Sequence, residues 1–152
     1  MLLSVVLVTL FVRLFINSYK AQLVGAMLTL SLPMGIVQST TTQTDYLAGF
    51  FLLTFLYFMF IIVRERPVYL MPNIAFATLA LGLGMLTKLT VALFAFPFCV
   101  WFAVLVIRRH RCAVILPAII GGLITISINA PFYSRNLSLT NNLVGSEELS
   151  TM

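Results

Sequence analysis

Three charged side chains that stand beside long uncharged stretches are the candidates for chemistry in this sequence. Asp45 ends a run of hydroxyl and amide side chains that starts at Gln38. Lys88 separates two apolar runs almost without a loop, and Arg135 follows a third apolar run. Lysine offers a phosphate group a point charge, and arginine offers a planar fork that fits phosphate oxygens. The two cations therefore predict binding of a phosphorylated substrate at a membrane surface, near the polar segment that contains Asp45.

Each of these residues also has a plainer interpretation. Asp45 could cap a helix, because an acceptor at a helix N-terminus satisfies free N–H groups and suits the helix dipole. Lys88 could extend its ammonium group to lipid phosphates, since a cation at the bilayer centre costs roughly 2.5–3.5 kcal/mol. Arg135 could anchor a helix end at the interface beside Tyr133. Position along the chain leaves both interpretations open for all three residues.

The composition excludes a water-soluble domain. Hydrophobic residues make up 61% of the 152 residues, charged residues only 9%, and the mean hydropathy is +1.10. Soluble domains are close to half apolar and a quarter charged. The net charge of +5 does not indicate nucleic-acid binding, because the cations lie in short loops between apolar runs. The two cysteines, Cys99 and Cys112, lack metal-ligand spacing, and the sequence has neither a phosphate-binding glycine loop nor an HExxH motif. The residues therefore predict neither a metal nor another cofactor.

The charges divide the chain into six runs that are long enough, or nearly so, to cross a bilayer. A helical span needs about 20 mostly apolar residues, and strands would alternate with period two, which these runs do not. We therefore expect an all-α, polytopic membrane bundle of about six helices in residues 1–134, followed by an extracytoplasmic polar tail in residues 135–152. The expected spans are 1–16, 21–38, 46–63, 68–87, 89–107 and 112–134.

The loop cations predict the orientation of these spans. If the loops alternate between the two sides, most cations fall on one side, which would be cytoplasmic. That side receives Lys20 with Arg13 nearby, Arg64, Arg66, Arg108, Arg109 and Arg111, whereas the other receives Lys88 and Arg135. Asp45, Lys88 and Arg135 are then expected on the non-cytoplasmic face of a multi-pass protein, most simply of the plasma (inner) membrane.

Three motifs resemble one class of membrane enzyme. They are Leu32-Pro33, then Gln38-Ser39-Thr40 and Asp45 before an aromatic helix; Gly82-Leu83-Gly84-Met85-Leu86-Thr87-Lys88; and Pro131-x-Tyr133-x-Arg135-Asn136 followed by Gly145. Their order and spacing, from about Lys20 to Gly145, are similar to the GT-C class of glycosyltransferases. Within that class the sequence looks most like the protein O-mannosyltransferase and aminoarabinose-transferase-like branch.

The resemblance implies transfer of a sugar from a polyprenyl-phosphate carrier within the bilayer, on the non-cytoplasmic face. Carried over to this sequence, Lys88 would meet the carrier's phosphate, Arg135 would approach the phosphate or the sugar, and Asp45 would help to shape the outer cavity. Some relatives use a divalent metal, but one outward-facing acid does not support such a site here. The resemblance does not identify the acceptor.

One departure from the family pattern limits these expectations. In the family, the catalytic acid lies in a long outer loop after the first membrane helix, whereas Arg13 and Lys20 are the only charges before Asp45. We therefore expect an internal fragment with a partial GT-C membrane domain that lacks the catalytic acid and is inactive alone. The alternatives are a small polytopic transporter subunit, which would place ionisable groups near the midplane, and a membrane protein without catalytic activity.

Overall fold

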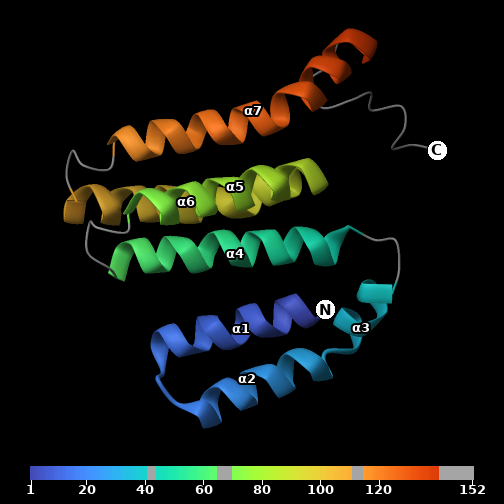
Figure 1. Cartoon of the computed structure of the whole chain (residues 1–152). Coiled ribbons are helices and arrows are strands. Elements are labelled where there is room, and N and C mark those ends of the chain that lie inside the picture. Colours follow the sequence, from blue (N-terminus) through green and yellow to red (C-terminus); the bar gives the residue numbers. More distant parts are fainter. Residues whose placement is uncertain (41–43, 65–69, 111–114, 141–152) are drawn as a thin grey trace.

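The chain folds as a bundle of helices. The computed structural model describes residues 1–40, 44–64, 70–110 and 115–140, and all regular secondary structure in these ranges is helical. The elements are α1 (Leu2–Phe15), α2 (Tyr19–Ser31), α3 (Pro33–Thr40), α4 (Asp45–Arg64), α5 (Leu70–Thr87), α6 (Thr90–His110) and α7 (Ile115–Thr140). Figure 1 shows the longer helices side by side, with the short α3 at one end of the bundle. The all-α membrane bundle predicted from the composition is confirmed.

Within the described residues, three helices are long and apolar enough to cross a membrane. They are α4, α5 and the part of α7 from Ile115 to Leu139, while Leu2–Phe15 and Thr90–Val106 form shorter apolar helices. Many large apolar side chains on these helices are exposed, which suits a surface that faces lipid. The protein is thus an integral membrane protein, and its division into six spans stays a prediction.

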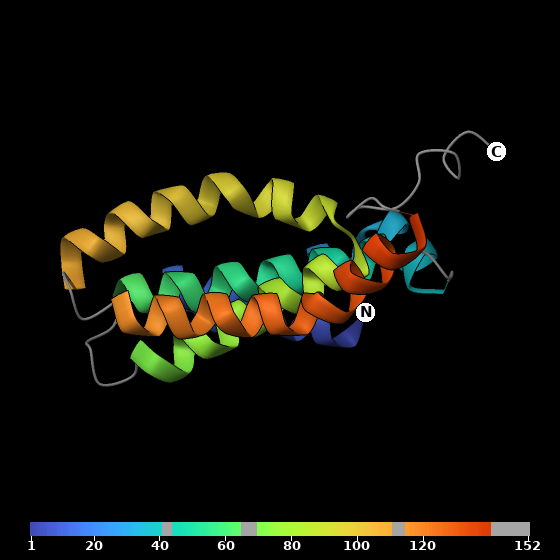
Figure 2. The same ribbon diagram turned by 90° about the horizontal axis from the view of Figure 1, so that it is seen from above.

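Prolines explain where the observed helices differ from the expected runs. The run 21–38 is split into α2 and α3 because Pro33 opens α3 and holds Leu32 in an extended conformation. Pro97 lies inside α6 and Pro131 inside α7, and each removes a backbone hydrogen bond from its helix. Figure 2 shows α6 bowed, and Figure 1 shows the last turns of α7 turning aside. Residues 135–140 of the expected tail continue α7, and residues 141–152 lie outside the described part.

Helix α5 is the centre of the packing. It has its most extensive contacts with α4 and α7, and it also contacts α6. Ala77 and Ala80 of α5 are buried together with Phe55 of α4 and Ala95 of α6. Small side chains at these positions let helices approach closely, which strengthens van der Waals packing between helices in lipid.

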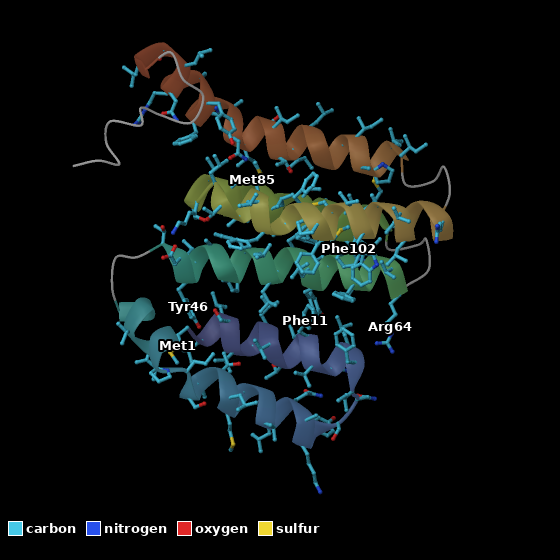
Figure 3. The ribbon with its side chains drawn as sticks, turned by 180° about the vertical axis from the view of Figure 1, so that it is seen from behind. Met1, Phe11, Tyr46, Arg64, Met85 and Phe102 are labelled. Carbon is cyan, nitrogen blue, oxygen red and sulfur yellow. The ribbon has the colours of Figure 1, made fainter. Side chains whose placement is uncertain are left out.

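Aromatic rings join α1 and α6 to α4. Phe60 of α4 meets Phe102 of α6 edge to face, with ring centroids 5.2 Å apart, and meets Phe11 of α1 in the same way at 5.5 Å. Phe102 is fully buried. Edge-to-face pairs bring the positive ring edge against the negative ring face. Figure 3 shows Phe11 and Phe102 on either side of α4.

The two ends of the bundle differ in charge. One end carries exposed cations at the α1–α2 turn and at the ends of α4 and α6, namely Arg13, Lys20, Arg64 and Arg108. The predicted loop cations Arg66 and Arg111 lie outside the described residues, as does the side chain of Arg109. At the opposite end lie the start of α4 and the ends of α5 and α7, where Figure 3 shows Tyr46 and Met85 far from Arg64.

Candidate functional site

An ion pair joins the start of α4 to the link between α5 and α6 at the less cationic end of the bundle. The Nζ of Lys88 donates a hydrogen bond to Oδ1 of Asp45, 43 positions earlier in the sequence. Relative exposures of 44% for the Lys88 side chain and 43% for Asp45 show that water or headgroups reach both. Exposed ion pairs contribute only about 0.2–1 kcal/mol to stability. The pair therefore matters more for where it holds the two charges than for stabilising the fold.

The backbone around Lys88 fixes the position of its side chain. The N–H of Lys88 donates to the carbonyl of Gly84 at 3.0 Å and so completes the last turn of α5, while its own carbonyl accepts from the N–H of Val91 at 3.0 Å and opens α6. The Thr87 hydroxyl also donates to the Gly84 carbonyl, at 2.7 Å. With both backbone groups used by adjoining helices, the link of Lys88 and Leu89 has little freedom to move.

Asp45 is in the first turn of α4 and is not its N-cap. The carbonyl of the preceding residue, Thr44, accepts from the N–H of Ala48 at 2.9 Å, which makes Thr44 the capping position. The carboxylate of Asp45 still lies at the positive end of the helix dipole. Its hydrogen bond to Lys88 shows that a role beyond the helix terminus is compatible with this position.

A cavity of about 340 Å³ opens beside the ion pair. Its lining comes from the first turns of α4 and α6 and from the link between α5 and α6: Asp45, Ala48, Gly49, Leu52, Lys88, Thr90, Val91 and Phe94. The volume lies near the lower end of the range of roughly 300–1,000 Å³ for small-molecule sites. Gly49 has no atom within 4 Å of where a Cβ would be, so it leaves the wall of the cavity open. The cavity offers one cation that is paired with a carboxylate, one hydroxyl and an apolar wall.

Arg135 lies at the same end of the bundle but outside this cavity. It belongs to the part of α7 that follows Pro131, its side chain is exposed, and it has no carboxylate partner in the described part of the chain. Figure 1 shows this part of α7 near the end of the bundle where α4 starts and α5 ends. The structure thus brings Asp45 and Lys88 into contact and leaves Arg135 separate from them.

Several site features could not be found by considering charged residues alone. Thr90 and Phe94 line the cavity because they lie on the first turns of α6, directly after the link that contains Lys88. Of the acids in the sequence, the described residues contain Asp45, and no group of three or more His, Cys, Asp or Glu side chains gathers within residues 1–40, 44–64, 70–110 and 115–140. Asp45 is therefore a single acidic ligand for a metal ion, and it is already paired with Lys88.

A second, apolar groove lies nearer the cationic end and is lined by residues of α4, α5, α6 and α7. It has a volume of about 720 Å³, and Phe102, Val106, Ile119 and Ile126 are among its lining residues. Figure 2 shows that the ribbons of α6 and α7 are not adjacent over most of their length. The groove shares no lining residue with the cavity at Lys88, and nothing in the described chain identifies what fills it.

Comparison with known proteins identifies the family. The sequence model of the family described as dolichyl-phosphate-mannose-protein mannosyltransferase matches residues 1–134. The chain belongs to this family. The mannosyltransferase family consists of membrane glycosyltransferases of the GT-C type, which confirms the resemblance inferred from the motifs. Corresponding comparisons with curated proteins and with solved structures gave no match. The matched residues include Asp45 and Lys88, whereas Arg135 lies one position beyond the match.

Proposed function

We propose that this mannosyltransferase-family protein takes part in sugar transfer from a polyprenyl-phosphate carrier on the non-cytoplasmic face, and that Lys88 contacts the carrier's phosphate. The observation that carries this proposal is the Asp45–Lys88 ion pair on the wall of the cavity of about 340 Å³. A lysine held by a carboxylate beside an open cavity is positioned before a ligand arrives. Arg135, at the same end and without a carboxylate partner among the described residues, is a second cation for the phosphate or the sugar.

The distribution of charge supports this orientation. Lys20, Arg64 and Arg108 are exposed at the end of the bundle opposite to Lys88. Cationic loops stay preferentially on the cytoplasmic side of a membrane. The Lys88 cavity then opens on the other side, near the headgroup level, where the phosphate of a lipid carrier lies while its isoprenoid chain stays in the hydrocarbon.

In this proposal the main contribution of the site to sugar transfer is positive charge beside the departing phosphate. An acceptor nucleophile attacks C1 of the sugar, the C1–O bond to the phosphate breaks, and the bonding electrons stay on the phosphate oxygen. Lys88 and Arg135 stabilise this departing charge, which is a large contribution in transfers of this kind. Asp45 holds the Lys88 ammonium group, so we assign it no role as the base that takes the acceptor's proton. In this proposal that base lies outside the described residues.

Carrier binding tests the proposal without requiring turnover. In the purified chain in lipid nanodiscs, Lys88→Ala is expected to weaken binding of a short-chain polyprenyl monophosphate roughly 10- to 100-fold, because it removes a charge-assisted hydrogen bond worth about 1.5–3 kcal/mol. The matched control is Lys20→Ala, which removes an exposed lysine from the opposite end of the bundle. Native mass spectrometry or a radiolabelled-ligand assay measures both affinities.

Two comparisons complete this experiment. The corresponding polyprenyl alcohol, which lacks the phosphate, should bind with equal affinity to the parent chain and to Lys88→Ala. Equal weakening of phosphate binding by Lys20→Ala and Lys88→Ala would show a general effect of surface charge and would remove Lys88 from the site.

A further inference from the structure

Two hydrogen bonds tie α7 to α5 at a constant register. The hydroxyl of Thr125 donates to the carbonyl of Thr78 at 3.1 Å, and the side-chain amide of Asn129 donates to the carbonyl of Gly82 at 3.1 Å. In both bonds the two residues are 47 positions apart. Figure 1 shows that α5 and α7 both run from the cationic end toward the Lys88 end. The two bonds therefore connect consecutive turns of two parallel helices. We call the pair of bonds the α5–α7 ladder and each bond a rung.

Glycine makes the close approach at the ladder possible. A Cβ on Gly82 would lie 3.4 Å from the Cα of Thr125, and a Cβ on Gly121 would lie only 2.5 Å from Cγ2 of Thr78. Each glycine thus faces a residue of a rung across the interface. With the backbones so close, the short side chains of Thr125 and Asn129 reach carbonyl groups of the neighbouring helix.

Burying the Asn129 side chain at this position lowers the stability of the fold, which packing alone does not explain. It is 2% exposed, and its Oδ1 accepts no hydrogen bond in the described structure. A buried polar atom without a partner destabilises a fold, and an apolar side chain would avoid that cost. The amide nitrogen, in contrast, is fully used, because it donates to Gly82 and also to Thr125 of its own helix at 2.9 Å. A single buried polar side chain that fixes the register of two helices is a known use of such a cost.

The register of the ladder relates Lys88 to Arg135. Lys88 lies six positions after Gly82, and Arg135 lies six positions after Asn129, so in sequence the two cations keep the offset of 47 that the rungs share. Lys88 directly follows the end of α5, and Arg135 lies on the part of α7 that turns aside after Pro131. Each rung advances both helices by four residues, or about 6 Å along the axis. A slip of α7 on α5 would therefore move Arg135 along the membrane normal relative to Lys88.

We infer that Asn129 is a positioning residue, which fixes the register of α7 on α5 (the register lock) and so sets the position of Arg135 along the bundle relative to Lys88. The fixed register is a property of the two helices and does not depend on what the protein does. Its purpose, to present two cations to one anionic headgroup, rests on the proposed function. Pro131 follows Asn129 by two positions, so the Asn129 rung fixes α7 just before the helix turns aside.

Spin labels test the lock directly. In a chain with Cys99 and Cys112 replaced by serine, labels at Leu89→Cys and Leu137→Cys report the separation of the two helix ends, because both leucine side chains are exposed. In lipid nanodiscs, one narrow distance distribution is expected for the parent. Asn129→Leu should broaden the distribution or shift its maximum by several ångströms. The control Ser127→Leu, at an exposed position of the same helix, should leave it unchanged.

A milder variant guards against loss of folding. Thr125→Val keeps the shape of the side chain and removes one rung, so it should broaden the same distribution to a smaller extent. Unchanged distributions in folded Asn129→Leu and Thr125→Val chains, with helical content equal to that of the parent, would overturn the inference.

Measurements of carrier binding then test whether the fixed register serves to present Arg135 to the phosphate. If the lock presents Arg135 to the phosphate, Asn129→Leu and Arg135→Ala should each weaken binding of the polyprenyl monophosphate, and the double variant should be no weaker than Arg135→Ala alone. A distance change without any effect of Arg135→Ala on binding would keep the lock and reject the proposed role of Arg135. Additive losses in the double variant would overturn the positioning of Arg135 by Asn129.

Discussion

Lys88→Glu is expected to weaken binding of a polyprenyl monophosphate at least 100-fold, more than any other single change at the candidate site. The substitution removes the cation and places a second carboxylate against Asp45, so the formal charge of the pair falls from zero to −2. Because both side chains are partly exposed, solvent weakens the repulsion between the two carboxylates. A phosphate bound in the cavity would lie close to both carboxylates and would be repelled by them. The affinity is measured in nanodiscs, as for the alanine variant.

The exchange of both charges separates folding from binding. Asp45→Lys combined with Lys88→Glu restores opposite charges at the same two positions, so resistance to unfolding should return to nearly the parent value. Phosphate affinity should stay below that of the parent, since the cation is no longer on the rigid α5–α6 link. Parent-like binding by the single Lys88→Glu variant would show that the phosphate does not bind at this cavity.

Gly121→Ala is expected to cause the largest loss of stability among single-methyl changes in the bundle. The new Cβ would lie 2.5 Å from Cγ2 of Thr78 and 3.1 Å from its Oγ1. Thr78 is restrained, because its hydroxyl donates to the carbonyls of Ile74 at 2.9 Å and Ala75 at 3.1 Å. The helices must therefore separate, at a cost of about 1–3 kcal/mol. Unfolding by sodium dodecyl sulfate, followed by circular dichroism, measures the change.

The neighbouring glycine supplies the control for this experiment. Gly122 has nothing within 4 Å of where its Cβ would be, so Gly122→Ala should be neutral or slightly stabilising. Thr78→Ser removes the methyl group that the new Cβ at position 121 would meet, and in combination with Gly121→Ala it should recover much of the lost stability. Equal effects of alanine at the two glycines would contradict the close packing of α5 against α7.

Two of the long helices could be predicted closely because charged residues mark their ends. The uncharged run 46–63 corresponds to α4 and the run 68–87 to α5, within two residues at each end. The apolar run 21–38 does not reveal the division at Pro33, because hydrophobicity reports whether a segment is apolar but not whether its backbone hydrogen bonds are continuous. Likewise, the polar residues from Arg135 onward predict a tail, although α7 continues to Thr140.

The partners of the site residues could not be predicted in the same way. Asp45 and Lys88 were expected at one membrane surface, but their direct contact depends on how α4 packs against α5, and apolar runs do not encode neighbours. Asn129 carried a signal that charge counting overlooks, since an amide in the middle of an apolar run must find hydrogen-bond partners in lipid. Its register relation to Arg135 required the coordinates of both helices.

The claim on which the functional account depends is that the Lys88 cavity opens on the non-cytoplasmic face. Single cysteines in the cysteine-free chain test it when intact cells are treated with a membrane-impermeant maleimide. Thr44→Cys, Leu89→Cys and Leu137→Cys lie beside Asp45, Lys88 and Arg135, and all three replaced side chains are exposed. Lys20→Cys and Arg108→Cys report the opposite end of the bundle.

If the Lys88 cavity opens on the non-cytoplasmic face, the first three cysteines should react from outside intact cells, and the last two should react only after the membrane is permeabilised. Protection of the cysteine at 44, 89 or 137 until permeabilisation, with ready labelling at 20 and 108, would place the ion pair in the cytoplasm and contradict the proposed transfer site.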